Sequence, residues 1–344
     1  MNYKTTISDI AKELNVTPAT VSRALSDHPG ISAKTKVSVQ QTAQRLNYSR
    51  NRIASSLRSG KTWLVGVIIP SAEINFFGSV VHGIESIANT KGYNVLIYQS
   101  NEKGDHEAKG IETFLSARVD GILASIAKDT HDFSHFQEIK ERNVPLVFFD
   151  RANDDLGIPS VVIDDFKGGY VATEHLIKQG FNRIAHISGP QHIKIFNDRL
   201  RGYRKALSDY QIETDEQLIF DGNVSIESGK DAIRHFSAAS KMPDAVFAVE
   251  DFTALGAVQE LKQMNIQIPE EVGVIGFANE HFGEYITPGL STIDQQTVLM
   301  GKESVQLLMK LMGSEESIHA RPEKIVLEPV PVFRRSSIRR PEVL

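Results

Sequence analysis

The 344-residue sequence contains no cysteine and only one tryptophan. It also has no uninterrupted apolar run of the roughly 18 residues that a membrane-spanning helix needs. The missing cysteine excludes disulfide scaffolds and thiolate-bound zinc or iron–sulfur sites. The first residues lack the apolar core of a secretion signal, so we expect a cytoplasmic protein with no membrane partner. With 41% hydrophobic and 24% charged residues, the chain has a globular composition and the length of two or three domains.

Enzyme signatures are also scarce. The run Gly60-Lys61-Thr62 matches the end of a phosphate-binding loop, but Ser55 stands where the first glycine of that motif belongs. No Gly-x-Ser-x-Gly nucleophile motif occurs. His131 and His135 lack the glutamate of a zincin motif, and His186 in an apolar strand is expected to be a core residue. We therefore predict that the protein is not an enzyme and has no catalytic residue, metal or cofactor.

The charged residues are distributed unevenly. The whole chain has a net charge of −5, but residues 1–61 hold ten basic and three acidic side chains, a net charge of +7. The remaining residues therefore carry −12. A basic segment attached to an acidic body favours contact between that segment and a polyanion such as nucleic acid. A solvated charged surface is the alternative, and the order of residues within the segment has to distinguish the two.

The start of the chain has the signals of a short amphipathic helix. Thr6, followed three residues later by Asp9, approximates a capping box, and the apolar side chains of residues 7–14 keep helical spacing. Asn15 stands where a left-handed residue closes a helix. We therefore predict one helix that ends in a tight turn.

A second and a third helix are predicted directly after this turn. Thr17 followed by Pro18 combines an N-cap hydroxyl with proline at the first helical position. Residues 19–25 then continue a helix, and Ser32 precedes a third helical segment over residues 34–46. Two short helices joined by a tight turn form a helix-turn-helix, whose second helix enters the major groove of DNA.

Residues 51–61 form a short helical pattern on a basic connector. Isolated helices shorter than about 12–15 residues are marginal in water, so this segment would become ordered only against a partner. Two such helices from a dimer can insert an apolar wedge into the minor groove, and Leu57 is the candidate wedge. An ordinary linker is the alternative interpretation.

These residues together resemble the LacI/GalR family of bacterial repressors. The similarity lies in runs 6–11 (Thr-Ile-Ser-Asp-Ile-Ala), 16–25 (Val-Thr-Pro-Ala-Thr-Val-Ser-Arg-Ala-Leu), 46–48 (Leu-Asn-Tyr) and 51–54 (Asn-Arg-Ile-Ala), and in Leu57. One departure is Arg50, where the family usually has proline. The resemblance implies DNA contacts by Thr6, Thr17, Pro18, Ala19, Thr20, Ser22, Arg23, Asn51, Arg52, Ala54 and Leu57.

Beyond residue 62, continuous apolar strands alternate with helical segments, which indicates parallel sheets covered on both faces. The resemblance implies a periplasmic-binding-protein-like body of type I, with two α/β subdomains and a ligand cleft between them. We predict a DNA-binding domain over residues 1–50, a hinge over 51–61 and a ligand-binding and dimerisation domain over 62–344. The first subdomain is expected over 62–160 and about 291–320, and the second over 161–290 and about 321–344, including the strand 324–327.

The strand-end loops supply the candidate cleft residues. Arginines in a cleft can make bidentate contacts to carboxylates or neighbouring hydroxyls, and a phenylalanine can stack on a sugar face. Strand-end position and the resemblance together give eight candidate effector residues: Phe76, Phe77, Arg151, Arg199, Glu250, Asp251, Asn279 and Gln295. Among them, Arg151 is chosen for its place after a strand, and Glu250 departs from the asparagine that the family often has. The sequence departs from the family at Ile74-Asn75, where Asn-Pro is common, at Ala278, where an aspartate is common, and at Val224, where several members have an aromatic residue.

The favoured hypothesis is a homodimeric transcriptional regulator, expected to be a repressor of carbohydrate metabolism genes. It would bind a near-palindromic double-stranded DNA operator and respond to a small sugar-type effector in its cleft. Two cleft arginines without the usual aspartate also admit a sugar acid or phosphosugar, and a nucleobase is a further alternative. A solute-binding protein without DNA function and an α/β enzyme fused to a DNA-binding head remain as hypotheses from other classes.

Overall fold

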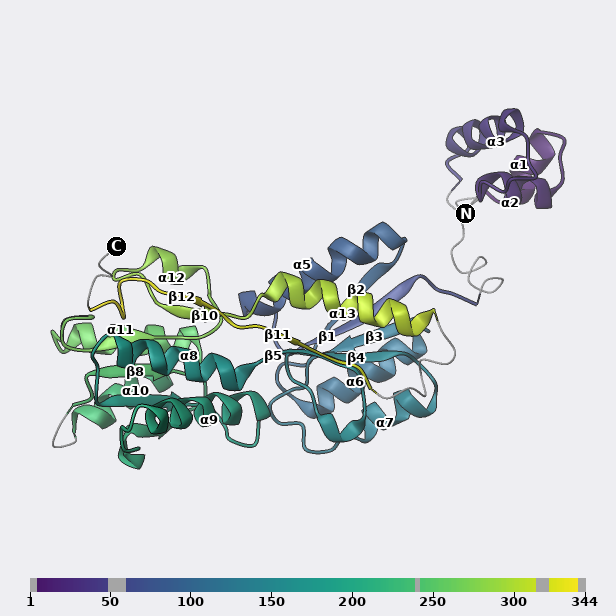
Figure 1. Ribbon diagram of the computed structural model, residues 1–344. Coiled ribbons are helices and arrows are strands. Elements are labelled where there is room, and N and C mark those ends of the chain that lie inside the picture. Colours follow the sequence, from purple (N-terminus) through teal and green to yellow (C-terminus); the bar gives the residue numbers. More distant parts are fainter. Residues whose placement is uncertain (1–4, 49–59, 239–241, 314–321, 340–344) are drawn as a thin grey trace. The chain divides into compact units, whose positions relative to one another are not determined.

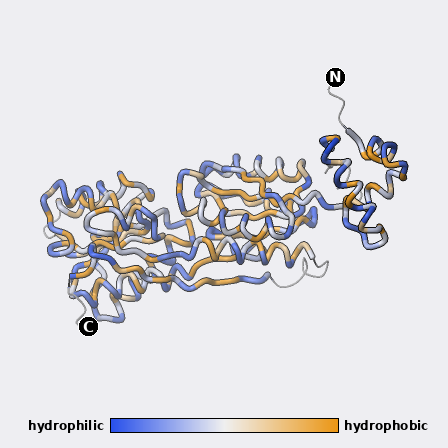
Figure 2. Tube along the Cα trace, turned by 90° about the horizontal axis from the view of Figure 1, so that it is seen from above, coloured by the Kyte–Doolittle hydropathy of each residue, from blue (hydrophilic) through white to orange (hydrophobic). Residues whose placement is uncertain are grey.

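The computed structural model describes residues 5–48, 60–238, 242–313 and 322–339. The chain folds as two compact units, Met1–Thr62 and Trp63–Leu344, which we call the head and the body (Figure 1). Hydrophobic and hydrophilic residues alternate along the helices in Figure 2, as expected where one face of each helix packs inward. Among the described residues, no helix has the length and apolarity needed to cross a membrane.

The head contains three described helices, α1 (Ile7–Glu13), α2 (Pro18–Leu25) and α3 (Ala33–Arg45). The N-cap hydroxyls of Thr17 and Ser32 accept hydrogen bonds from the third amide of α2 and α3, at 3.1 and 3.2 Å. Asn15 has a left-handed φ of 50°, which ends α1 as predicted. One small apolar cluster holds the helices together, and it consists of Ile10, Ala11, Val21, Ala24, Val39 and Ala43.

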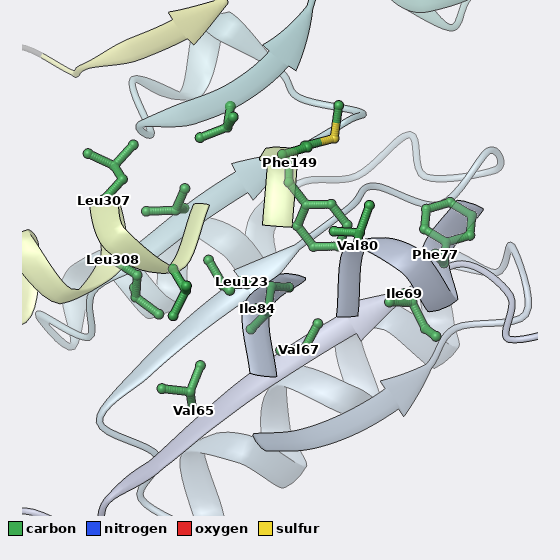
Figure 3. Close-up of a cluster of buried hydrophobic side chains, with 14 of the residues drawn as sticks. Val65, Val67, Ile69, Phe77, Val80, Ile84, Leu123, Phe149, Leu307 and Leu308 are labelled. Atoms are coloured by element: carbon green, nitrogen blue, oxygen red, sulfur yellow. The ribbon is translucent and has the colours of Figure 1, made fainter. Parts of the chain in front are cut away.

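The first half of the body is built on a parallel sheet with the described strand order β11-β5-β4-β3-β1-β2. Helices α5 and α13 cover one face, where their apolar side chains meet those of β1, β3 and β4 (Figure 3), and α6 and α7 cover the other. The elements are β1 (Leu64–Ile69), α5 (Asn75–Ala88), a 3₁₀ turn (Asn89–Lys91), β2 (Asn94–Gln99), α6 (Gly104–Ser116), β3 (Gly121–Ala124), α7 (Ser134–Glu141), β4 (Leu146–Phe149), a 3₁₀ turn (Asp154–Leu156), β5 (Ser160–Ile163), α13 (Thr297–Met312) and β11 (Lys324–Leu327).

The second half repeats this arrangement around a parallel sheet with the described order β7-β6-β8-β9. Helices α10 and α11 pack on one face, and α8 and α9 pack on the other. The elements are α8 (Asp165–Lys178), β6 (Ile184–Ser188), α9 (Lys194–Asp209), a 3₁₀ turn (Glu216–Leu218), β7 (Ile219–Asp221), α10 (Ile226–Ser237), β8 (Ala245–Ala248), α11 (Asp251–Gln263), β9 (Gly273–Ile275), α12 (Phe282–Tyr285), β10 (Thr292–Asp294) and β12 (Val330–Val332).

Helices α8 and α9 approach each other closely because two glycines face backbone atoms across the contact. A Cβ atom at Gly169 would collide with the carbonyl group of Arg199, and one at Gly202 would collide with the carbonyl group of Phe166. This packing fixes the position of α9, the helix that carries Arg199.

Within the described part of the body, the chain passes between the halves at three places, and two strands lie in a different half from the one predicted. The strand of residues 160–163 and the strand of residues 324–327 were both expected in the second subdomain. They pair with each other in parallel at the edge of the first sheet, as β5 and β11. The prediction was wrong because similar apolar strands can join either sheet, and only tertiary pairing decides between them. The return of α13 to the first half is as expected.

The three crossing segments are hydrogen-bonded to one another. The amide of Asp164 in the first crossing donates to the carbonyl of Leu327 in the third, at 3.0 Å. The side-chain amide of Gln296 in the second crossing donates to the carbonyl of Glu328 in the third, at 2.7 Å. Each crossing is therefore bonded to a neighbouring one.

Candidate functional site

The second helix of the head presents a polar surface. Val21 and Ala24 point into the core, whereas Thr17, Pro18, Ala19 and Arg23 are exposed. Thr6 is also exposed, and Thr20 and Ser22 are partly buried. The first turn of α2 and the Arg23 guanidinium therefore lie on one accessible side of the head.

This surface has the chemistry that major-groove contact requires. Pro18 and Ala19 offer methyl or methylene contacts without hydrogen bonds, and Arg23 offers donors for a guanine edge or a phosphate. Part of the hydroxyl capacity of Thr17 and Thr20 is used in the helix cap, since their oxygens lie 2.9 Å apart. The expected hinge contacts of Asn51, Arg52, Ala54 and Leu57 lie outside the described residues.

The body contains a cavity of about 240 Å³ between its two halves. It lies at the carboxyl ends of the strands, where ligands bind in open α/β sheets. Six of the eight predicted effector residues line it: Phe76, Phe77, Arg151, Arg199, Glu250 and Gln295. A wider groove of about 750 Å³ shares Lys128, Asp150, Arg151 and Ile195 with the cavity.

The structure does not bring Asp251 and Asn279 to the cavity wall. The Asp251 carboxylate is fully buried and accepts hydrogen bonds from the Glu280 amide and the Thr292 hydroxyl, at 2.7 and 2.8 Å. The Asn279 side chain donates to Asp294 at 2.9 Å and accepts from Arg334 at 3.0 Å. Both side chains therefore hold the loops that surround the cavity rather than facing it.

Arg199 is the most enclosed cation of the cavity, with 2% of its surface exposed. Its Nε atom donates to Asp165 at 2.8 Å, and its Nη1 atom donates to the Val249 carbonyl at 2.8 Å. The guanidinium also lies 3.7 Å from the centroid of the Phe277 ring. Burial raises the pKa of Asp165 to about 7 even though Arg199 lowers it. Its Nη2 atom also lies 2.8 Å from Asp165, so protein groups contact all three nitrogens of this guanidinium.

Arg151 is held by a carboxylate from the same half of the body. Its Nη1 and Nη2 atoms donate to the two oxygens of Glu102, at 2.7 and 3.1 Å. The same carboxylate accepts the Lys128 amide at 3.0 Å and lies 3.6 Å from the Lys128 ammonium. Arg151 Nε is buried and has no partner among the described residues.

Three carboxyl groups complete the polar lining, and burial raises the pKa of each. The pKa of Glu250 rises to about 8, through burial and then through the neighbouring Asp251. Burial also raises the pKa of Asp150 and of Glu280. One oxygen of Glu250 caps α11 at the Phe252 amide, 2.9 Å away. The other oxygen is buried without a partner among the described residues.

The apolar part of the lining is aromatic on one side and strained on another. Phe76 and Phe77 pack edge to face with their centroids 5.0 Å apart. Val224 lines the cavity with a left-handed φ of 62°, which is unfavourable for a β-branched residue. The lining thus combines aromatic surface with charged groups, as small-molecule sites do.

The sequence analysis missed Lys128, Asp150 and Glu280 as lining residues. Lys128 lies in the loop after β3, where no motif marks it. Asp150 was visible as the residue before Arg151, and Glu280 as the residue after Asn279. Their position at the ends of strands was the available signal.

The histidines considered for catalysis or metal binding have structural contacts. His135 Nε2 lies 2.9 Å from Glu107, and His131 packs on the ring of His192 with centroids 5.4 Å apart. His186 is fully buried, and this burial lowers its pKa to about 3. Among the described residues, no group of three or more His, Asp or Glu side chains is arranged to hold a metal ion.

Comparison with known proteins agrees with this architecture. Residues 6–51 match the family described as bacterial regulatory proteins, lacI family, and residues 173–337 match the periplasmic binding protein-like domain. The probable HTH-type transcriptional repressor ExuR of Bacillus subtilis (strain 168) is 33% identical over 97% of this chain and 98% of its own length. The chain belongs to the lacI family. This family membership confirms the predicted fold class and the prediction of a DNA-binding transcriptional regulator.

Two solved structures extend the comparison over the whole fold. The lac repressor dimer bound to operator and the anti-inducer ONPF matches with a TM-score of 0.87 and 26% identity, over 98% of this chain and 100% of that one. The complex of the transcriptional regulator CelR with cellobiose matches with a TM-score of 0.71 and 29% identity, over 97% of this chain and 100% of that one.

Proposed function

We propose that this protein is a homodimeric repressor of carbohydrate metabolism genes that binds a near-palindromic operator and is controlled by a small sugar-type effector. The lac repressor structure, in which a dimer binds operator, supports the dimer and the DNA partner. The cellobiose complex of CelR supports a sugar-type effector. In this proposal the protein acts in the cytoplasm, on double-stranded DNA, without an enzymatic reaction.

The observation that carries the effector part is the set of unpaired polar atoms in the cavity. Arg151 Nε is a donor, whereas Glu250 Oε1 donates when its carboxyl is protonated and accepts when it is ionised, and both atoms are buried without a partner among the described residues. A buried polar atom without a hydrogen bond costs about 1–3 kcal/mol, so a ligand that pairs with both atoms recovers this cost. Sugar hydroxyls donate and accept, and Phe76 and Phe77 offer apolar surface for a ring face.

The DNA part depends on the exposed residues of α2. One helix-turn-helix reads only a half-site, so a dimer is needed for a near-palindromic operator. We propose that Thr6, Thr17, Pro18, Ala19, Thr20, Ser22 and Arg23 contact DNA in the head, and that Asn51, Arg52, Ala54 and Leu57 contact it in the hinge. Either sign of effector response fits the structure, since it requires only different effector affinity for two states.

Operator binding tests this function directly. The full chain and a variant lacking residues 1–61 are titrated with duplexes selected from a random library, at several salt concentrations. We expect tight binding that falls steeply with salt, loss of binding on deletion, and a palindromic selected sequence. Arg23→Gln should lower the affinity for the selected duplexes by ten-fold or more, whereas Lys91→Gln in the body should leave this affinity unchanged. Binding that survives the deletion, or no selected sequence at low salt, would refute the DNA function.

A further inference from the structure

We propose that the effector carries an anionic group, and that Lys128 and Arg151 bind this group at the wall formed by the first half of the body. This inference rests on the proposed function and names the ligand class of the same cavity. It starts from a local excess of positive charge around one saturated carboxylate.

Glu102 is the carboxylate that Lys128 and Arg151 share. One of its oxygens accepts from Arg151 Nη1 at 2.7 Å and from the Lys128 amide at 3.0 Å. The other accepts from Arg151 Nη2 at 3.1 Å and lies 3.6 Å from the Lys128 ammonium. Arg151 lowers the pKa of Glu102, although burial opposes this, so the carboxylate is ionised. One negative charge therefore faces two positive charges.

Arg151 Nη1 also donates to the Ile126 carbonyl at 3.3 Å, but no group among the described residues accepts a hydrogen bond from Nε. The nearest further carboxylate oxygen, on Asp150, lies 3.8 Å from Arg151 Nε, beyond hydrogen-bond distance. Burial raises the pKa of Asp150, and burial followed by the Arg151 charge lowers the pKa of Lys128. Arg151 is 8% exposed, and its Nε atom lacks a partner. An anionic group of the ligand would supply both the missing acceptor and the missing charge.

The second half of the body favours hydroxyl groups instead. Glu250 and Glu280 line the cavity from the loops after β8 and β9, and burial raises the pKa of both. Glu250 Oε1 has no partner among the described residues, and it can donate to a hydroxyl when protonated or accept from one when ionised. A sugar acid has the complementary pattern, with one carboxylate and several hydroxyl groups.

Calorimetric titration of the full-length protein at pH 7 tests this inference with three kinds of probe. The probes are glucuronate, galacturonate and gluconate as acids, glucose and galactose as neutral sugars, and glucose 6-phosphate as a phosphosugar. We expect an acid to bind, its affinity to fall with ionic strength, and Lys128→Gln to weaken it at least ten-fold. Lys103→Gln, an exposed lysine paired with Asp129, is the matched control and should leave the affinity unchanged.

The outcomes separate this inference from the proposed function. Binding of glucose 6-phosphate alone would support the anionic wall and identify the group as phosphate. Binding of neutral sugars without the acids or the phosphosugar would overturn the inference and leave the sugar effector intact. An affinity for acids that Lys128→Gln does not change would also overturn it. Binding of none of these probes would instead count against the sugar-type effector itself.

An independent observation concerns the start of α5, and from it we infer that Glu280 couples the cleft to this helix. The N-cap residue Ile74 has no side chain that can accept a hydrogen bond, and it stands where family members commonly have asparagine. The acceptor comes from the other half of the body, because the Phe76 amide donates to Glu280 Oε1 at 3.2 Å. The helix is therefore capped across the cleft.

Glu280 is well placed for this role. It is 4% exposed and lines the cavity, so it lies beside the ligand as well as the helix. Its own amide donates to the buried carboxylate of Asp251 at 2.7 Å, which fixes it to the second half. Separation of the halves would remove the cap from α5, and closure would restore it. Loss of a helix cap destabilises the helix, so the cap favours the closed arrangement of the halves.

Hydrogen–deuterium exchange over residues 74–80 tests the cap without an effector. We expect Glu280→Ala to raise exchange at the first turn of α5, and Ile74→Asn, which supplies a local cap, to return it to the wild-type level in the double variant. Glu284→Ala, at an exposed position of α12, is the control. Once an effector is known, the effect of this effector on operator affinity should be smaller in the double variant than in the wild-type protein. Unchanged exchange in Glu280→Ala, or an unchanged effect of the effector in the double variant, would overturn the inference.

Discussion

The two arginines of the cavity show how differently two walls of one site can hold the same side chain. Arg199 and its partner Asp165 are both almost fully buried, and the guanidinium stacks on Phe277. The side chain of Glu102, the partner of Arg151, is 23% exposed, and Lys128 competes for it. Arg199 is thus part of the folded core of the second half, whereas Arg151 keeps an unpaired donor and an excess of positive charge for a ligand.

The largest effect is expected from Arg199→Leu. Removing one partner of a buried ion pair leaves the other charge uncompensated, which costs about 3–5 kcal/mol. Urea unfolding of the full-length protein should show this loss in the transition of the body. Arg201→Leu on the same helix, where the arginine is exposed and pairs with Asp198, should cost about 0–1 kcal/mol. Equal losses in the two variants would contradict the structural role of Arg199.

Glu102→Gln should lower the stability of the protein by an intermediate amount and raise its affinity for an anionic ligand. Hydrogen bonds to charged groups contribute about 1.5–3 kcal/mol, and partial exposure of Glu102 places the expected loss at the lower end. The same change leaves Lys128 and Arg151 without their carboxylate, so the affinity for a sugar acid should rise. Calorimetry and urea unfolding measure the two quantities. Glu112→Gln, at an exposed position of α6, should change neither the stability nor the affinity. Weaker binding of the sugar acid by Glu102→Gln would contradict the expected competition between Glu102 and the ligand.

The smallest effect is expected from pH. The folded-state pKa of Glu250 is raised to about 8, so the folded protein binds this proton more tightly than the unfolded chain. Its contribution to stability is therefore complete below about pH 4.5 and is lost as the pH rises through 8. His175 and His186, whose pKa values burial lowers to about 4 and 3, act in the opposite direction but only below their ordinary value near 6.5.

Thermal unfolding between pH 7 and pH 8.5 covers this contribution together with the upper part of the titrations of Asp165 and Asp251, whose pKa values burial raises to about 7. The Glu250→Gln variant separates the Glu250 contribution from theirs. We expect the melting temperature to fall over this interval, and Glu250→Gln to reduce the fall. Glu284→Gln, at an exposed position, should leave the slope of the wild-type protein unchanged. A slope in Glu250→Gln equal to that of the wild type would show that Glu250 does not titrate there.

The head was predictable from the sequence because its signals are local. The caps Thr17 and Ser32 and the left-handed Asn15 act within a few residues of the helices they delimit. In the body, β5 and β11 were placed in the wrong half because strand pairing joins residues about 160 positions apart. The apolar pattern of a segment predicts that it is a strand, but it does not predict the strand with which it pairs.

The cavity was predictable where a residue ends a strand and faces the cleft, or where the family resemblance identified it. Arg151 follows strand β4 and lines the cavity. Arg199 lies within helix α9, and the resemblance alone pointed to it. Asp251 follows Glu250 in sequence but turns into the protein, where it holds the loop of Glu280. Lys128 gave no signal, because its position depends on Glu102 in a different loop.

The hydrogen-bonded crossings between the halves also have a mechanical consequence. Three chain segments lie side by side and are joined by backbone and side-chain hydrogen bonds from Asp164 to Leu327 and from Gln296 to Glu328. Hinge closure about such a band is the relative motion that we expect of the two halves. A small ligand in the cleft therefore acts by changing the angle between the two halves of the body. Any surface formed by both halves would change its shape with this angle.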